Sequence, residues 1–494
     1  MTTPSLTWHS TPDGTRHRAL DSFELFLRML SESEAAIERE HFAITLAVRL
    51  SFPDGVTDAE PYVRRAWLRL RRLHPTLGGS VTAPSADARI LSVGPLDEQA
   101  WLSTTFRAHA PDDRDAADSS RLFTHGSVRP ADTVLCHWLP ASSEVCIRAA
   151  HWRVDAIGLL LLGHSFLSTL ASVIGSGLDA ESTVPTELGP LTPSLFELID
   201  SFADEESTPP ALKSIADSIV SGVVRGGPSI ALPIKETPAP DGPGATLREA
   251  TTLDESTTSA IIAATKTKGI SVTSALHAAI VRVTAAFPQH PLAKSYATFC
   301  PADVRRHLSS PYNQDAYAVA NYFSALPICV PDVVDETMGW AKSFDAVAAE
   351  LDTIYSQGLD KMSTDDAGNP VGIQKLLGPL TRRVVKLCTT PPPPELPQAQ
   401  NAEFSSVGRI NSYMRHEYAI DTTQGQALGV SGMWLGLEVT TRSVHFHAWT
   451  FRNELTLQAC FNSNFYDRDF VVEVLDKIKQ ELFLGIGIEQ SADA

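Results

Sequence analysis

The chain has 494 residues, too many for one compact core, so its length predicts two domains. It is 43% hydrophobic and 20% charged, a composition that excludes a disordered protein. The formal net charge of -18 argues against a protein that neutralises nucleic-acid phosphates or anionic lipid, so we expect neither nucleic acid nor a membrane as a partner.

The N-terminal segment MTTPSLTWHSTPDGTRHRAL has no continuous apolar stretch, so no secretory signal is predicted. The most apolar stretch, IGLLLLG at 157–163, is well short of the roughly 20 residues that cross a bilayer. The six cysteines are scattered and form no CxxC pair, so we expect neither a zinc site nor a disulfide framework. These observations favour a soluble, cytoplasmic protein without a metal, and we expect a monomer.

The first half of the chain mixes strand-like and helical segments. HFAITLAVRLS at 41–51 is rich in branched apolar residues and predicts a strand. The segment 61–77 carries apolar residues at helical spacing and predicts a helix that Pro75 closes.

A second strand and a long helix follow around a short polar turn. EVCIRAA at 144–150 predicts a strand that leads directly to His151, and 156–174 is so apolar that it predicts a buried helix. His151 and Asp155 are therefore expected in the turn between the two elements, where side chains can project into a cavity.

Acidic residues, prolines and glycines gather at 202–245, which predicts a linker with one short helix near 210–222. We therefore expect an N-terminal domain at 1–201 and a C-terminal domain at 246–494.

The second half is predicted to have the same mixture of elements. Asp254 is a capping residue before a helix and Gly269 follows its end, and another helix is predicted at 272–287. Prolines predict an extended loop at 389–400. The other predicted elements are strands at 294–304, 321–330, 403–410, 429–439, 444–451 and 454–461, and helices near 340–357 and at 468–483.

His151 and Asp155 are the residues from which we expect chemistry. A neutral imidazole, with a pKa of about 6.5, can accept a proton from an alcohol or amine that attacks a thioester. Asp155 either polarises this imidazole or is a structural anion that pairs with a distant arginine. We favour the structural role, because a carboxylate at the start of a buried helix needs a cationic partner. By its spacing alone, the His and Asp pair is also compatible with an ordinary structural turn.

The segment AAHWRVDAIG at 149–158 resembles the HxxxD motif of a superfamily of acyltransferases. That superfamily includes chloramphenicol acetyltransferase, plant BAHD acyltransferases, condensation domains of peptide synthetases and fungal trichothecene O-acetyltransferases. The resemblance covers about residues 18 to 485. It extends, in the same order, to AWLRLRRLHPTL, ISVTSALHAAIVRVTAAF, CPADVRRHL, NYFSALPICV and FSSVGRI.

This resemblance implies an α/β fold of two chloramphenicol-acetyltransferase-like mixed-sheet domains with a channel between them. It implies that His151 is the general base and Asp155 the structural aspartate, with Arg305 as its expected partner and Arg306 as second choice. The implied reaction moves an acyl group, most simply acetyl, from acyl-CoA to a hydroxyl of a small secondary metabolite. Acyl-CoA is then a co-substrate, and no bound cofactor is expected.

The sequence departs from the superfamily pattern at several points. Ala156 stands where glycine is usual, Ala150 replaces the first histidine of condensation domains, and the DFGWG motif of plant enzymes is absent. These departures favour a stand-alone enzyme of the fungal type. They leave the oxyanion donor unassigned, so Ser431, in a glycine-flanked turn, is a candidate, and Asn321 is a candidate substrate contact.

Two other functions are compatible with the same motif. The base could act in condensation, release or cyclisation of a polyketide or peptide held on an acyl carrier protein, or the chain could be a degenerate member that only binds a ligand. His445 and His447 alternate on one predicted strand, but without a third ligand nearby we expect a polar sheet face and no metal.

Overall fold

The computed structural model describes residues 5–85, 88–125, 133–178, 188–199, 204–236, 242–335, 339–420 and 425–489. Contacts between Cα atoms divide the chain into two compact units. Both units combine helices with sheets, so the predicted α/β class is confirmed. Unit 1 consists of Met1–Ile199, Arg305–Tyr322 and Ile410–Glu438, and unit 2 of Asp200–Val304, Phe323–Arg409 and Val439–Ala494.

Two segments from the second half of the sequence, 305–322 and 410–438, therefore belong to unit 1. Nothing in the local sequence predicts these insertions. Of the predicted linker, 202–203 and 237–241 lie outside the described residues, and the domain boundaries at 201 and 246 stay predictions. The helix expected near 210–222 is present as α7, Pro210–Arg225.

Unit 1 is built on a six-stranded sheet in the order β15-β16-β3-β8-β7-β6. Its neighbouring strands are antiparallel except for β6 and β7, which are parallel. Ile44 lies opposite Ala149 and also opposite Leu437. The first residue of β3 and the last residues of β8 and β16 therefore lie at the same edge of the sheet. The strands are β15 (Glu417–Ala419), β16 (Ala427–Leu437), β3 (Ile44–Ser51), β8 (Glu144–Ala149), β7 (Leu135–Leu139) and β6 (Phe106–Ala108).

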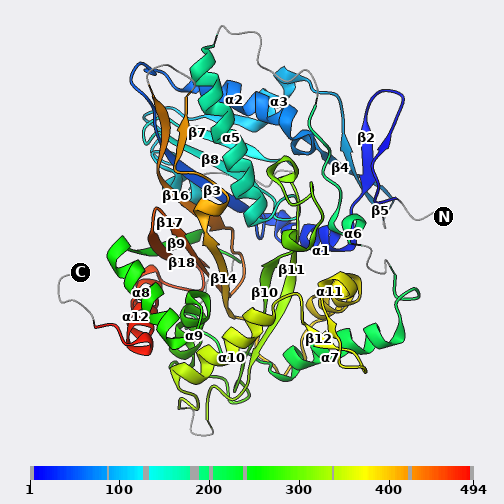
Figure 1. Cartoon of the computed structure of the whole chain (residues 1–494), viewed down its shortest axis with the longest axis vertical. Coiled ribbons are helices and arrows are strands. Elements are labelled where there is room, and N and C mark those ends of the chain that lie inside the picture. The colour runs from blue at the N-terminus through cyan, green and yellow to red at the C-terminus, as the bar shows by residue number, and fades with distance from the viewer. Residues whose placement is uncertain are drawn as a thin grey trace. The chain divides into compact units, whose positions relative to one another are not determined.

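The helix α5, Ala156–Ser176, packs against β3 and β16 of this sheet and against α2, Glu60–Leu73. Figure 1 shows α5 running beside α2 in unit 1. By length and composition α5 could cross a membrane, since it has 21 residues and a mean hydropathy of 1.9, but 61% of that stretch is buried inside the structure. The helix agrees with the buried helix predicted at 156–174, and its burial is that of a core helix.

Aromatic side chains fix α2 in the core of unit 1. Trp67 is completely buried, its ring stacks on Trp101 at 5.6 Å, and Phe166 of α5 meets it edge-on. The indole nitrogen of Trp67 donates to the Thr105 hydroxyl at 2.8 Å, so its polar atom is satisfied in the core.

The rest of unit 1 surrounds this core. A second sheet has the order β1-β2-β5-β4, formed by His9–Ser10, Arg16–Ala19, Ala88–Val93 and Ser80–Ser85. The other helices are α1 (Ser22–Ser31), α3 (Glu98–Thr105), α4 (Ser119–His125) and α6 (Leu195–Leu198). Short 3-10 turns are η1 (Ala35–Ile37), η2 (Pro75–Gly78), η3 (Arg305–His307), η4 (Asp315–Tyr317) and η5 (Ile410–Ser412).

Unit 2 contains a four-stranded sheet in the order β14-β17-β18-β9 and the antiparallel pair β10 and β11. The pair β14 and β17 is parallel, and the other neighbours are antiparallel. These strands are β14 (Ala402–Arg409), β17 (Val444–Phe451), β18 (Glu454–Asn462), β9 (Thr246–Leu253), β10 (Tyr296–Asp303) and β11 (Phe323–Val330). A short pair joins β12 (Ser363–Thr364) to β13 (Pro370–Val371).

The helices of unit 2 follow the predicted positions closely. Asp254 accepts a hydrogen bond from Thr257 N at 2.7 Å, and Gly269 has a φ of +70°, so both predicted caps of α8 are present. The unpredicted helix α11 packs against α7. Besides α7, the helices described in unit 2 are α8 (Glu255–Lys268), α9 (Val272–Ala285), α10 (Phe344–Gln357), α11 (Ile373–Thr389) and α12 (Arg468–Ile486).

Candidate active site

His151 lies in the turn that connects the end of β8 to the start of α5, as the sequence pattern predicts. Asp155 is the N-cap of α5, and its Oδ1 accepts a hydrogen bond from Gly158 N at 2.7 Å. Aspartate suits this position because its carboxylate satisfies a free helical N–H and meets the positive end of the helix dipole. The helix start therefore fixes the turn that carries His151.

The second oxygen of Asp155 joins the turn to a segment far along the chain. Asp155 Oδ2 accepts from Arg305 Nη1 at 2.9 Å and from Tyr322 N at 2.7 Å, while Asp155 N donates to Ala320 O at 3.1 Å. Asp155 and Arg305 are only 3% and 5% exposed. Both carboxylate oxygens are therefore engaged in holding structure, the role that the sequence favours for this residue.

Tyr322 supports the arginine that pairs with Asp155. The Arg305 guanidinium lies 5.3 Å from the centre of the Tyr322 ring, and the Tyr322 hydroxyl donates to Pro193 O at 2.9 Å. A buried cation over an aromatic face, with its charge also neutralised by a carboxylate, has little freedom to move. The neighbouring Arg306, the second choice from the sequence, is exposed and donates to His307.

The side-chain amide of Asn321 contacts the main chain of His151. Its Nδ2 donates to the carbonyl oxygen of His151 at 3.0 Å, and the residue is 6% exposed. The sequence offered Asn321 as a substrate contact, whereas the structure places its amide against the backbone of the base. This hydrogen bond holds the His151 turn against the segment 318–322.

Gly158 allows this close approach. A Cβ atom there would clash with the carbonyl oxygen of Ala318 and would come within 2.8 Å of Val154 Cγ2 and 3.0 Å of Arg305 Nη2. Gly158 belongs to no motif that predicts this contact, although a glycine in the first turn of an apolar helix is a signal of close backbone packing. Ala156, where the superfamily usually has glycine, is the first residue of α5.

The imidazole of His151 is half-buried at this turn. Burial lowers its pKa below the usual value, while a hydrogen bond with its own backbone and the charge of Asp155 act in the opposite direction. The ring is therefore neutral at neutral pH and can accept a proton. Phe42 lies beside it, with ring centroids 6.5 Å apart at 61°, a neighbour that no local sequence pattern predicts.

Ser431 does not lie at this site. It is exposed on β16 at an irregularity in the pairing with β3, where its hydroxyl donates to Arg49 O at 3.3 Å. The strand edge next to His151 is at Leu437, six residues or about 20 Å further along β16. The glycine-flanked turn expected around Ser431 is thus an irregularity within a long strand, and the role of Ser431 as an oxyanion donor stays a prediction.

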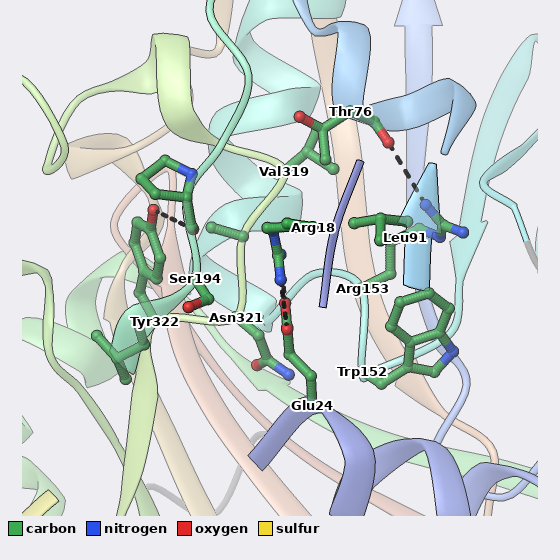
Figure 2. Close-up of a pocket in the computed structure, with 13 residues that line it drawn as sticks. Arg18, Glu24, Thr76, Leu91, Trp152, Arg153, Ser194, Val319, Asn321 and Tyr322 are labelled. Carbon is green, nitrogen blue, oxygen red and sulfur yellow. Dashed lines mark hydrogen bonds and ion pairs between the residues drawn. The ribbon is translucent and has the colours of Figure 1, made fainter. Parts of the chain in front are cut away.

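A small cavity lies behind the His151 turn, on the side of Trp152 and Arg153 (Figure 2). Its volume is about 10 Å³, the space of one water molecule, so it is no substrate pocket. Arg18 Nε and Asn321 Oδ1 are buried there without hydrogen-bond partners among the described residues. Figure 2 shows Arg18 paired with Glu24 among the lining residues.

No group of three or more histidine, cysteine or acidic side chains that could hold a metal ion occurs within the described ranges. His445 and His447 lie on β17 of unit 2, both half-buried and on the same face of the sheet.

Comparison with known proteins gives relatives along the whole chain, although no protein-family model matches the sequence. The sequence is 28% identical to the loline biosynthesis cluster 1 transcription factor lolU1 of Epichloe uncinata, over 97% of each chain. It is 26% identical to the acetyltransferase pigO of Monascus ruber, over 97% of this chain and 98% of pigO.

Among solved structures, the chain is similar to TRI3 trichothecene 15-O-acetyltransferase from Fusarium sporotrichioides. The TM-score is 0.75 at 17% identity, over 97% of this chain and 98% of that structure. This similarity confirms the predicted chloramphenicol-acetyltransferase-like fold for the chain.

Proposed function

We propose that this chain, a member of the superfamily of chloramphenicol-acetyltransferase-like and condensation-like acyltransferases, moves an acyl group from acyl-CoA to a hydroxyl of a small secondary metabolite. One observation carries this function: a neutral imidazole, His151, is held in a fixed turn by the buried pair of Asp155 and Arg305. The relative named as an acetyltransferase supports acyl transfer as the reaction class and acetyl as the simplest donor.

In the proposed reaction, His151 accepts the proton of the acceptor hydroxyl while that oxygen attacks the thioester carbonyl carbon. The tetrahedral intermediate then collapses, the C–S bond breaks, and the proton on His151 passes to the CoA thiolate. The products are an ester and free CoA, and the imidazole returns to its neutral form. Asp155 takes no part in proton transfer, because both of its oxygens accept hydrogen bonds from Gly158, Tyr322 and Arg305.

The donor can be tested before the acceptor is known. Calorimetry with acetyl-CoA and with free CoA should show micromolar binding to the wild type and to His151→Ala, because the substitution removes the base and leaves the fold. With an acceptor found by screening, thiol release should fall by roughly a thousandfold or more in His151→Ala. His290→Ala, at an exposed histidine of unit 2, is the matched control and should keep wild-type turnover. Retained turnover in His151→Ala would rule out the base.

A carrier-bound substrate is the second candidate, favoured by the membership of condensation domains in the same superfamily. In that case neither acetyl-CoA nor CoA binds, and the wild type instead consumes an acyl group loaded on an acyl carrier protein. Intact-mass measurement of the carrier before and after incubation separates the two donors.

The name of the loline relative would give a third function, control of transcription. The net charge of -18 opposes it, since DNA binding depends on neutralising phosphates with lysine and arginine. Acyl transfer is therefore the function that we propose.

A further inference from the structure

Phe42 has a backbone conformation that bulky residues rarely adopt. Its φ is +63°, in the left-handed region, in the connection that leads from η1 into β3. A large side chain at positive φ is strained unless its surroundings impose the conformation, and such residues gather at functional sites. The contacts around Phe42 explain how this conformation is held.

Main-chain hydrogen bonds tie Phe42 to the end of β16. Phe42 N donates to Glu438 O at 2.9 Å, and Glu438 N donates to Ala43 O at 2.8 Å. These bonds continue the pairing of β3 with β16 past the last residues of both strands. Phe42 therefore sits at the sheet edge beyond which His151 also lies.

Two ion pairs hold the residues immediately before Phe42. Arg39 Nε donates to the Glu438 carboxylate at 2.8 Å, and the Glu40 carboxylate pairs with Arg148 at 3.1 Å. The second pair is buried, with side chains 5% and 8% exposed, and Arg148 belongs to β8, the strand that leads to His151. The segment is thus attached to β16 on one side and to β8 on the other, so its strained residue cannot relax without breaking buried contacts.

The ring of Phe42 faces the base. Its centroid lies 6.5 Å from that of His151 at 61°, an edge arrangement, and His41 stacks on the same phenyl ring at 3.8 Å and 27°. His41 is 4% exposed. Burial, and the charge of His151 when protonated, lower the pKa of His41 to about 4, so His41 is neutral at neutral pH. The phenyl ring of Phe42 therefore lies between the imidazoles of His41 and His151 in a chain of ring contacts.

We propose that Phe42 is a positioning residue of His151: its left-handed backbone presents the phenyl ring to the imidazole, which fixes the plane of the imidazole and keeps water from one of its sides. Phe42 has this role only if His151 is the base of the proposed function. The titratable groups that act on His151 here are Asp155 on its own turn and His41 beside the phenyl ring.

The substitution Phe42→Gly distinguishes the effect of the phenyl ring from the effect of the strained backbone. Glycine adopts positive φ without steric cost, so Phe42→Gly removes the phenyl ring and leaves the backbone in an easy conformation. Phe42→Tyr keeps the ring and the strain and is the matched control. Both variants can be studied in the whole chain without any acceptor, by the pH dependence of histidine modification with diethyl pyrocarbonate.

Trypsin releases the two histidines in separate peptides, because arginines flank both sites. His151 falls in residues 149–153 and His41 in residues 40–49, each peptide with a single histidine. Mass spectrometry of these peptides gives the modification rate at each imidazole. The midpoint of the rate against pH reports the pKa of His151, because only the neutral ring reacts.

In Phe42→Gly we expect water to reach the imidazole, so that the midpoint for His151 rises by on the order of one pH unit. The thermal midpoint of the variant should equal or exceed that of the wild type, and Phe42→Tyr should keep the wild-type modification midpoint. A wild-type midpoint in Phe42→Gly, or an equal rise in both variants, would overturn the role of the ring. Neither result bears on acyl transfer, which the acetyl-CoA experiments test separately.

Discussion

Arg305 and Asp155 stand 150 residues apart in the sequence and form one buried ion pair, with Arg305 Nη1 at 2.9 Å from Asp155 Oδ2. The pair connects the N-terminus of α5 to a segment inserted into unit 1 from the second half of the chain. Because the same carboxylate also accepts from Gly158 N and Tyr322 N, the His151 turn depends on one partner in its own helix and on two partners, Arg305 and Tyr322, in one distant segment.

Breaking this pair from either side should destabilise unit 1 strongly. Asp155→Asn can still cap α5 but leaves the Arg305 cation buried without its anion, and Arg305→Leu leaves the anion without its cation. Each substitution should cost about 3–5 kcal/mol in the free energy of unfolding. The double variant should lose less than the sum of the two, as measured by urea unfolding followed by circular dichroism. Strictly additive losses would show that the two residues do not act as a pair.

Gly158 gives a prediction opposite to helix propensity. Alanine is the better helix former by roughly 1 kcal/mol, yet Gly158→Ala should lower the thermal midpoint, because its Cβ would meet Ala318, Val154 and Arg305. The matched control is Gly222→Ala in α7, where a Cβ would meet no atom within 4 Å. That variant should melt at or above the wild-type temperature. A stabilised Gly158→Ala protein would mean that the turn packs less closely than described.

Asn321 should influence catalysis through the backbone of the base. In Asn321→Asp the donor that holds the His151 carbonyl becomes an acceptor facing an acceptor, so the turn should shift. We expect kcat to fall about tenfold, equivalent to about 1.4 kcal/mol, with KM for the acyl donor little changed. The exposed Asn313 lies on the same inserted segment, and Asn313→Asp is the control for the added charge. Equal effects of the two substitutions would exclude a specific role for Asn321.

The local part of the site could be predicted from the sequence. The strand before His151 and the apolar helix after Asp155 follow from residues within one short stretch, where periodicity rules apply. The capping of this helix by Asp155 is a finding of the structure. The partner of Asp155 could be named as Arg305 only through the resemblance to a known superfamily, since no local rule links positions 150 residues apart.

The contacts that complete the site depend on the tertiary structure. The apolar pattern predicts Asn321 and Tyr322 within a strand, whereas β11 begins only at Phe323, so both residues can turn toward Asp155 and the His151 carbonyl. The pattern likewise predicts Phe42 within a strand that begins only at Ile44. In each case the strand begins a few residues after its apolar pattern begins. The residues before the strand, Asn321, Tyr322 and Phe42, make the contacts with the His151 turn.

The buried histidine of unit 2 predicts how stability changes in acid. His277 is completely buried, with Nδ1 at 2.8 Å from the Tyr355 hydroxyl and Nε2 at 2.9 Å from the Tyr296 hydroxyl. Burial lowers its pKa to about 3, whereas an unfolded histidine titrates near 6.5. Between these values the unfolded chain binds a proton that the folded chain does not.

The contribution of His277 to stability is therefore complete above pH of about 6.5 and is lost as the pH falls toward 3. In that window the free energy of unfolding should rise with pH by up to about 1.4 kcal/mol per unit for this residue. His277→Gln, which cannot titrate, should lose this slope even though it also loses stability at every pH. Urea unfolding at a series of pH values measures both slopes, and the two curves should become parallel above pH of about 7. Equal slopes in acid would mean that the imidazole is protonated in the folded protein, against the burial on which the low pKa rests.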